Sequence, residues 1–211
     1  MMVKSQRIGL ALGVAALAAA AATAFAVPAK AHVQAAGVVK PGAWCGGNLW
    51  KLMTLSDTGR TSVNWTPKPT SIPEMSKLTP PVRVLASRNS AFEKQVWSET
   101  VVIERYRVQS NGELAFELFD IPSGMYMNAY MPNPQCLSST TRGRASILSA
   151  RTAFTSVCPA ATADWQPLGA SVTLTGVGFW NPVKTTLGAL GNGAELRPVT
   201  GFSLINGCGK F

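Results

Sequence analysis

The chain has 211 residues, of which 46% are hydrophobic and 14% are charged, and its formal net charge is +9. This length suits one medium domain or two small ones. The apolar fraction excludes a disordered chain, and 19 glycines without a regular period exclude a collagen-like one.

The first 31 residues have the order of a secretory signal peptide. Lys4 and Arg7 form a positive start, residues 8–27 are uncharged and rich in Ala and Leu, and small residues follow at 24–26 and 29–31. This order is typical of an exported protein whose signal is removed. An uncleaved membrane anchor is the alternative, because about 20 apolar residues can cross a bilayer. No Cys closely follows the apolar segment, which argues against a lipid anchor.

Removal of residues 1–31 would lower the formal charge from +9 to +6, because three basic residues and no acidic residue are lost. No later hydrophobic run is long enough to cross a membrane. We therefore expect a basic bacterial protein that is secreted, periplasmic or located in the cell envelope, with no membrane span after signal cleavage.

The four cysteines, Cys45, Cys136, Cys158 and Cys208, all follow the expected cleavage sites. An even number in an oxidising compartment favours two disulfide bonds, for which three pairings exist. We expect Cys45–Cys208, which would join the ends of the domain, and Cys136–Cys158, which would close a short loop. A zinc site is disfavoured, because no two cysteines have Cys-x-x-Cys spacing and the single histidine is His32. We expect no metal and no cofactor.

Residues 32–95 are rich in Pro, Thr and Ser and predict an extended N-terminal arm that wraps the following domain. The prolines within 66–70 and 79–81 should break regular structure, because proline fixes φ and lacks an N–H donor. Residues 71–78 favour one short helical turn. A disordered linker is the alternative, but Trp44, Trp50 and Trp65 favour burial.

Residues 96–211 have the patterns of a β domain. Segment 99–108 is rich in β-branched and aromatic residues, and Asn111-Gly112 is a typical hairpin turn. Apolar and polar residues alternate in 113–120 and again in 125–131. These segments predict three antiparallel strands. In the third, one face carries Met125, Met127, Ala129 and Met131, and the other carries Tyr126, Asn128 and Tyr130.

A helix and two more strands complete the predicted domain. Residues 143–157 have helical spacing, and their apolar stripe includes Ile147, Leu148, Ala150, Phe154 and Val157. We expect Arg142, Arg144 and Arg151 to form a solvated face of this helix. Strands are predicted at 170–179 and 194–204, with a loop between them. Three strands, a helix and two strands follow the order of an OB-fold, a five-stranded Greek-key barrel. The prediction is therefore a mainly β protein with a small five-stranded OB-like barrel.

Residues 175–181 (TGVGFWN) and 192–199 (NGAELRPV) resemble a segment of many uncharacterised, exported bacterial proteins, where it reads GVGFFD, HGQTG, APN and IELHPV. Looser matches extend this resemblance over most of residues 51–199. The resemblance implies no defined activity, because members of this family are mostly unassigned. Residues 184–186 replace the family's His-Gly-Gln, and Arg197 replaces its last His, so chemistry of those histidines is not expected here.

A single histidine near the expected mature N-terminus excludes Ser–His–Asp, Cys–His and His-Glu-x-x-His sites. Carboxylate chemistry is the remaining catalytic alternative. A metal-assisted secreted hydrolase acting on phosphodiesters would draw on Glu117, Arg105, Arg107 and Arg197. No spacing in the sequence selects these residues.

We favour a non-enzymatic domain with a structural or binding role. An OB-fold binds ligands on the face of strands two and three and through nearby loops. The candidate ligand-binding residues are Tyr126, Asn128, Tyr130, Trp180, Lys184 and Arg197, with Gln109, Asn111 and Asn181 on the same surface. Aromatic packing in the core is the alternative role for the three aromatic residues, and a salt bridge for Glu195 and Arg197. The expected partner is an anionic envelope polymer or another protein, with weaker support for nucleic acid.

Overall fold

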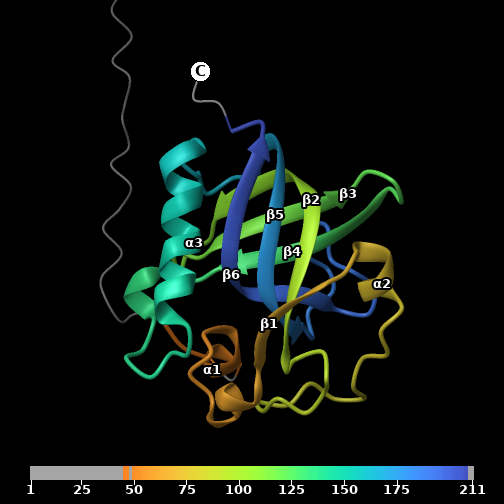
Figure 1. Ribbon diagram of the computed structural model, residues 1–211, viewed down its shortest axis with the longest axis vertical. Helices are drawn as coiled ribbons and strands as arrows, with labels where there is room; N and C mark the ends of the chain where they lie inside the picture. The colour runs from red at the N-terminus through yellow and green to blue at the C-terminus, as the bar shows by residue number, and fades with distance from the viewer. Residues whose placement is uncertain (1–44, 48, 209–211) are drawn as a thin grey trace, which may run out of the picture. The chain divides into compact units, whose positions relative to one another are not determined.

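Three consecutive strands begin the β domain, as the alternation predicted. They are β2 (Gln95–Val108), β3 (Leu114–Asp120) and β4 (Met125–Met131). A helix, α3 (Arg144–Val157), follows, and then two long strands, β5 (Gln166–Trp180) and β6 (Ala194–Asn206) (Figure 1). A short 3₁₀ turn, η2 (Pro134–Cys136), follows β4. The protein is mainly β, as predicted.

The structure is a computed structural model that describes residues 45–47 and 49–208. The predicted signal segment, residues 1–31, and His32 lie outside the described residues. Within the described ranges, no helix has the length and hydrophobicity needed to cross a membrane.

The predicted extended arm contains four short elements. They are α1 (Trp50–Met53), the 3₁₀ helix η1 (Thr58–Ser62), β1 (Asn64–Pro69) and α2 (Ile72–Ser76). The short helical turn is confirmed as α2, and residues 79–81 lie outside any helix or strand, as expected. The expectation that Pro67 and Pro69 break regular structure was wrong, because strand β1 contains both, with a register shift between Asn64 and Lys68. This strand pairs with β2 alone at the sheet edge, where a proline without an N–H group interrupts no pairing with a second neighbour. The sheet therefore has six strands.

The strand pairings connect five strands in a closed circuit. The order in the mixed sheet is β1-β2-β3-β4-β6-β5, and β5 pairs again with β2. The pairs β1–β2 and β4–β6 are parallel, and the others are antiparallel. The β4–β6 contact has the single registered pair Ala129 and Leu196. Helix α3 connects β4 to β5 in the chain.

Strands β3 and β4 direct alternate side chains into one core, as predicted. The core-facing residues of these strands include Leu114, Phe116, Leu118, Met127, Ala129 and Met131. Phe154 of α3 packs edge-on against Phe116 and Tyr106, with ring centroids 5.0 and 5.6 Å apart. The opposite faces of β3 and β4 carry Glu117, Asn128 and Tyr130, which form the candidate site described below.

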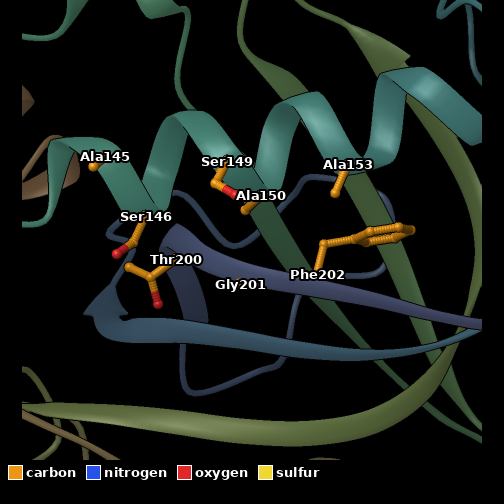
Figure 2. A pocket seen from close by; sticks show the side chains of 8 residues that line it. All are labelled: Ala145, Ser146, Ser149, Ala150, Ala153, Thr200, Gly201 and Phe202. Carbon is orange, nitrogen blue, oxygen red and sulfur yellow. The ribbon is translucent and has the colours of Figure 1, made fainter.

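Helix α3 lies beside β6 and leaves a groove of about 430 Å³ along their contact (Figure 2). Its lining is made of small or apolar residues, namely Ala145, Ser146, Ser149, Ala150, Ala153, Thr200, Gly201 and Phe202. None of these side chains is charged at neutral pH. The groove therefore offers no acid–base group and no charge for a ligand.

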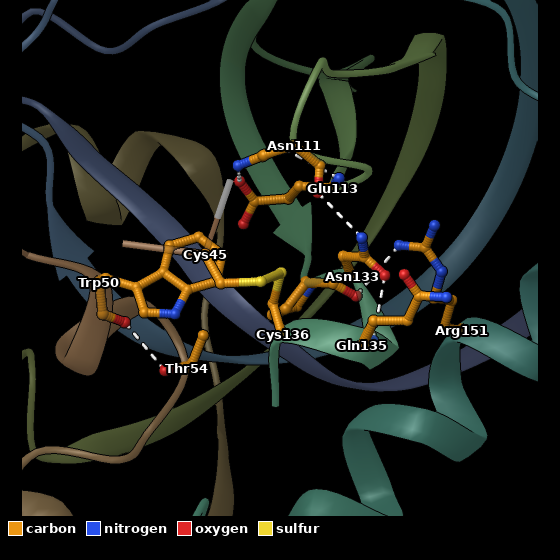
Figure 3. Close-up of a disulfide and its surroundings, with 10 residues drawn as sticks. Cys45, Trp50, Thr54, Asn111, Glu113, Asn133, Gln135, Cys136 and Arg151 are labelled. Atoms are coloured by element: carbon orange, nitrogen blue, oxygen red, sulfur yellow. Dashed lines mark hydrogen bonds between the residues drawn. A yellow bond between two sulfur atoms is a disulfide. The ribbon is translucent and has the colours of Figure 1, made fainter. Parts of the chain in front are cut away.

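The structure has two disulfide bonds, but the predicted pairing was wrong. The bonds join Cys45 to Cys136 and Cys158 to Cys208 (Figure 3 shows the first). The prediction assumed that the two ends of the domain meet. Instead, the start of the arm lies beside the turn after β4, and the segment after β6 lies beside the end of α3.

Arg151 of α3 does not lie on a solvated face, contrary to the prediction. One guanidinium nitrogen donates to the carbonyl oxygens of Met131 and Pro132, at 2.9 and 3.1 Å, and the other donates to Gly112 at 2.9 Å. Arg144 is exposed, as predicted. Arg151 thus joins α3 to the ends of β3 and β4, because these carbonyls lie where the strands stop.

Arg142 also has a structural role. Its Nη1 donates to the carbonyl oxygens of Arg60, Thr61 and Val63 at 2.8–2.9 Å. The guanidinium lies 5.3 Å from the centre of the Trp65 ring. Arg142 therefore attaches the arm to the segment before α3, and its charge is directed inward.

Candidate binding site

The six predicted ligand-binding residues fall into buried and accessible groups. Lys184 is exposed and Tyr126 is half-buried. The other four are buried, namely Asn128, Tyr130, Trp180 and Arg197. In this structure, a ligand therefore has no continuous aromatic surface on β4 to stack against.

Arg197 on β6 is the centre of a buried charge cluster. Its guanidinium forms a two-pronged ion pair with Glu113, and Nη1 lies 3.5 Å from Oε1 of Glu195. The guanidinium also lies 4.3 Å from the centre of the Tyr130 ring. Nδ2 of Asn181 donates to Glu195 at 2.9 Å. The expected Glu195–Arg197 contact is present as part of this larger network.

Burial and charge act in opposite directions within this cluster. Burial disfavours the charged form of Arg197, but the carboxylates of Glu113 and Glu195 outweigh it and raise the pKa of the guanidinium. Burial raises the pKa of Glu195 to about 7, against the opposing effect of Arg197. Burial and the Glu195 carboxylate raise the pKa of the Tyr130 hydroxyl. Because its charges already pair internally, the cluster connects β6 to the start of β3 rather than offering a free charge to a ligand.

A second polar group lies on the same outer face. Glu117 on β3 and Asn128 on β4 are directly opposite each other and are only 3% and 1% exposed. Within the described residues, Oε2 of Glu117 and both polar side-chain atoms of Asn128 have no hydrogen-bond partner. Burial raises the pKa of Glu117, although the nearby Arg105 opposes this shift. Nε of Arg105 lies 3.5 Å from Oε2 of Glu117, and the Arg105 side chain is 46% exposed.

The loop between β5 and β6 lies over this pair. Gly188 has φ of +75°, and a Cβ at this position would lie 2.8 Å from Cγ of Glu117 and 2.9 Å from Oδ1 of Asn128. Only a residue without a side chain allows this close approach. The loop thus covers the outer face of β3 and β4.

Trp180 is buried in the main core. Its Nε1 donates to Oγ of Ser90 at 3.0 Å, and its ring lies 4.6 Å from that of Phe92. These contacts agree with the alternative in which this aromatic residue has a packing role.

A cleft of about 350 Å³ lies between the segment after α2 and the loop after β5. Its lining residues are Pro80, Pro81, Val82, Arg83, Val84, Trp180, Asn181, Pro182, Lys184 and Asn192. Arg83 and Lys184 are both exposed, and no acidic residue belongs to this lining. We call it the basic cleft.

Exposed apolar side chains lie in and next to the two segments that line the basic cleft. Val82, a lining residue, is fully exposed. Leu85, Val183 and Leu187, which lie in the same two segments of the chain but outside the lining, are 45%, 55% and 44% exposed. These four are among the seven large apolar side chains that are exposed in the described residues. Exposed apolar surface next to a cleft is typical of interaction sites.

One side chain holds the two walls together. Nδ2 of Asn192 donates to the carbonyl oxygens of Met75, Ser76 and Leu78, at 2.9, 3.2 and 3.0 Å. The arm and the β5–β6 loop are therefore fixed to each other at the base of the cleft.

Glu99 on β2 is a further buried carboxyl group. It is 2% exposed, and neither of its oxygens has a hydrogen-bond partner in the described part of the chain. Trp97 and Val101, which share its face of β2, pack with the main core. Burial, reinforced by Asp120 and Glu74, raises the pKa of Glu99 to about 8. This carboxyl group is therefore mostly protonated at neutral pH.

The residues considered for a hydrolase come together only in part. Arg105 and Glu117 are neighbours, whereas Arg107 lies 4.7 Å from the Trp165 ring and Arg197 is paired with Glu113. Among residues 45–47 and 49–208, no three His, Cys, Asp or Glu side chains are grouped so that they could hold a metal ion.

No protein-family model matches this chain, and no curated protein matches it. The resemblance of residues 175–181 and 192–199 to exported bacterial proteins therefore stays a prediction.

Sequence analysis identified one wall of the basic cleft and missed the other. Lys184, Asn181 and Trp180 were candidates, but residues 80–85 were treated as part of a wrapping arm. Their only signal is a Val-Arg-Val-Leu run after two prolines, and this run has no period that would separate an exposed wall from a buried one.

Proposed function

We propose that this protein is an exported, disulfide-stabilised binding domain without catalytic activity. In this proposal, an acidic and amphipathic segment of a partner protein docks in the basic cleft. The observation that carries the proposal is a cleft whose lining holds two exposed cations, the fully exposed Val82 and no acidic residue, with three more exposed apolar side chains in the two segments that supply this lining.

Charge and hydrophobicity together favour a protein partner over a simple polyanion. Arg83 and Lys184 attract a negatively charged ligand and steer its approach. Val82, Leu85 and Val183 gain from contact only if the ligand also removes apolar surface from water. A polysaccharide or nucleic acid backbone would be attracted by the two cations but would leave the apolar side chains exposed to water.

The proposed fold is an OB-like barrel formed by β2–β6, with β1 as an added edge strand. The closed circuit β2-β3-β4-β6-β5-β2 and the position of α3 between β4 and β5 support this assignment. The two disulfides support an extracellular or envelope location, because such bonds persist in oxidising compartments. We also infer kinship with the exported bacterial proteins that share the GVGF and ELRPV elements.

The hydrolase alternative lacks an accessible reaction centre. Its carboxylate, Glu117, is buried under Gly188, and Arg105 already faces that carboxylate. We therefore do not favour it.

Site-specific photo-crosslinking tests the proposed function. A photoreactive residue replaces the exposed Val183, which stands between the cleft-lining residues Pro182 and Lys184. The matched control places it at Ile205, which is also exposed but lies near the end of β6. In the cells that export the protein, position 183 should give one defined protein adduct through an acidic, amphipathic segment. The double variant Arg83→Glu/Lys184→Glu should lose this adduct. An adduct that survives charge reversal, or that also forms from position 205, would overturn the proposal.

A further inference from the structure

We propose that the outer face of β3 and β4, beneath the tip of the β5–β6 loop, is a second binding site that takes a neutral, hydroxyl-rich ligand such as a sugar unit. The site uses Glu117, Asn128 and Tyr126, none of which lines the basic cleft. The two sites share the β5–β6 loop, which supplies Pro182 and Lys184 to the cleft, but no side chain binds in both, so sugar binding and peptide binding are measured separately.

The first argument is the buried hydrogen-bonding capacity at this face. Glu117 and Asn128 lie side by side on paired strands, and both are more than nine-tenths buried. Neither polar atom of the Asn128 amide is hydrogen-bonded to a described residue. Oε2 of Glu117 also lacks such a hydrogen bond and has only the ion pair with Arg105 at 3.5 Å. Buried polar groups in native proteins are nearly always paired, so the unpaired amide of Asn128 indicates a partner.

The second argument concerns the charge of that partner. The carboxylate of Glu117 repels an anion, and Arg105 at 3.5 Å already balances it and disfavours a cation. The ligand is therefore neutral. It must accept from Nδ2 of Asn128 and donate to Oδ1 and to the carboxylate, and a hydroxyl group does both.

The third argument is the rim of the site. Tyr126 lies on the same face of β4 as Asn128 and is half-buried, and the centre of its ring lies 4.8 Å from that of Phe119. The two rings, tilted by 33° to each other, provide apolar surface next to the polar pair. A sugar ring, which has an apolar C–H face and hydroxyl groups at its edge, matches this combination.

Access requires only movement of the loop tip. The base of the loop is fixed, because the Asn181 amide donates to the Gly193 carbonyl at 2.8 Å, Asn192 is bonded to the arm, and Leu190 is buried. In the tip, residues 182–185 and 187 are exposed. Gly188 lies on the polar pair without a side chain to anchor it. Displacement of the tip would uncover Glu117 and Asn128 while the base stays in place.

The test compares two glycine variants of the same loop. Gly188→Ala places a methyl group against Glu117 and Asn128 and strains the positive φ, so it should displace the tip. Gly191→Ala is the matched control, because a Cβ there meets no atom within 4 Å. Apparent affinity rises with the fraction of molecules in the open state. We expect Gly188→Ala to bind chitotetraose, a neutral oligosaccharide, at least about fivefold more tightly than the wild type, and Gly191→Ala to equal the wild type.

Two further measurements keep the proposal falsifiable if Gly188→Ala folds poorly. In the wild-type protein, millimolar chitotetraose or maltotetraose should shift the amide NMR signals of Asn128, Glu117 and residues 186–189. Asn128→Leu should remove those shifts while the protein stays folded. Shifts confined to other surfaces, binding of only an anionic oligosaccharide, or no shift with either neutral sugar would overturn the proposal.

Discussion

Single buried side chains determine much of the chemistry of this protein. Glu99 and Glu195 are carboxyl groups whose burial raises the pKa to about 8 and about 7. The positive charge of Arg197 partly offsets the effect of burial on Glu195. Within the described part of the chain, Glu99 has no such cation, and its charged neighbours are the carboxylates of Asp120 and Glu74. Glu99 is therefore the residue at which folding is most directly coupled to proton binding.

The stability of the wild-type protein should fall as the pH rises from about 4.5 to about 8. In this window the folded protein keeps a proton on Glu99 that the unfolded chain has lost, so the free energy of unfolding decreases by up to roughly 1.4 kcal/mol per pH unit. Glu99→Gln keeps an uncharged side chain of the same shape and should reduce this slope, leaving the part that Glu195, whose pKa is raised to about 7, contributes. Urea unfolding of the wild type and the variant at pH 5, 6.5 and 8 measures this dependence of stability on pH. An equal slope in the variant and the wild type would contradict this assignment.

Alternation along β3 and β4 predicted which residues face the core, since burial follows a period of two on a strand. For Tyr130 and Arg197 the sequence offered both ligand binding and a structural role, namely aromatic packing and a salt bridge with Glu195. The structural role is the one present, and the main partner of Arg197, Glu113, is distant in sequence. Local pattern thus identified the candidate residues, whereas their exposure depended on tertiary contacts.

At the scale of elements, helix α3 is attached to the strands by one long side chain as well as by its apolar stripe. Ile147, Ala150 and Phe154 are buried, as the spacing predicted. Val157 is 38% exposed, because it is the last residue of the helix. Spacing alone placed Arg151 in solvent, since carbonyl groups at strand ends have no sequence signal.

Arg151→Met should destabilise the protein by about 2–4 kcal/mol, because three carbonyl oxygens lose a charged donor in a half-buried position. Arg144→Met, on the same helix and exposed, should change stability by no more than about 0.5 kcal/mol. Chemical unfolding of both variants provides the comparison. Equal effects would mean that the Arg151 contacts contribute nothing beyond an exposed helix charge.

At the scale of the whole molecule, two covalent links and several inward-directed arginines hold the arm, helix and sheet together. Arg88, like Arg142, is directed into the fold, where it pairs with Asp57 and donates to the carbonyl oxygen of Leu52. The excess of basic residues is therefore partly internal. Because several basic residues are directed inward, the basic composition does not show where positive charge lies on the surface, and the basic cleft could not be located from it.

Non-reducing peptide mapping should recover peptides that link Cys45 to Cys136 and Cys158 to Cys208. Replacing either pair by serine should cost about 4–5 kcal/mol of stability, since the bonds close segments of 91 and 50 residues. Recovery of a Cys45–Cys208 peptide would contradict the fold. The sequence could not choose among the pairings, because the choice depends on where the arm enters the sheet.

Docking of an acidic, amphipathic segment in the basic cleft is tested most directly by titration with a labelled peptide that has one glutamate-rich face and one leucine-rich face. Arg83→Glu/Lys184→Glu should weaken binding at least tenfold, or about 1.4 kcal/mol. Lys51→Glu/Arg144→Glu makes the same change in net charge at exposed sites outside the cleft lining and should stay within about twofold of the wild type. Equal loss in the two double variants, or no binding by the wild type, would contradict the proposed function.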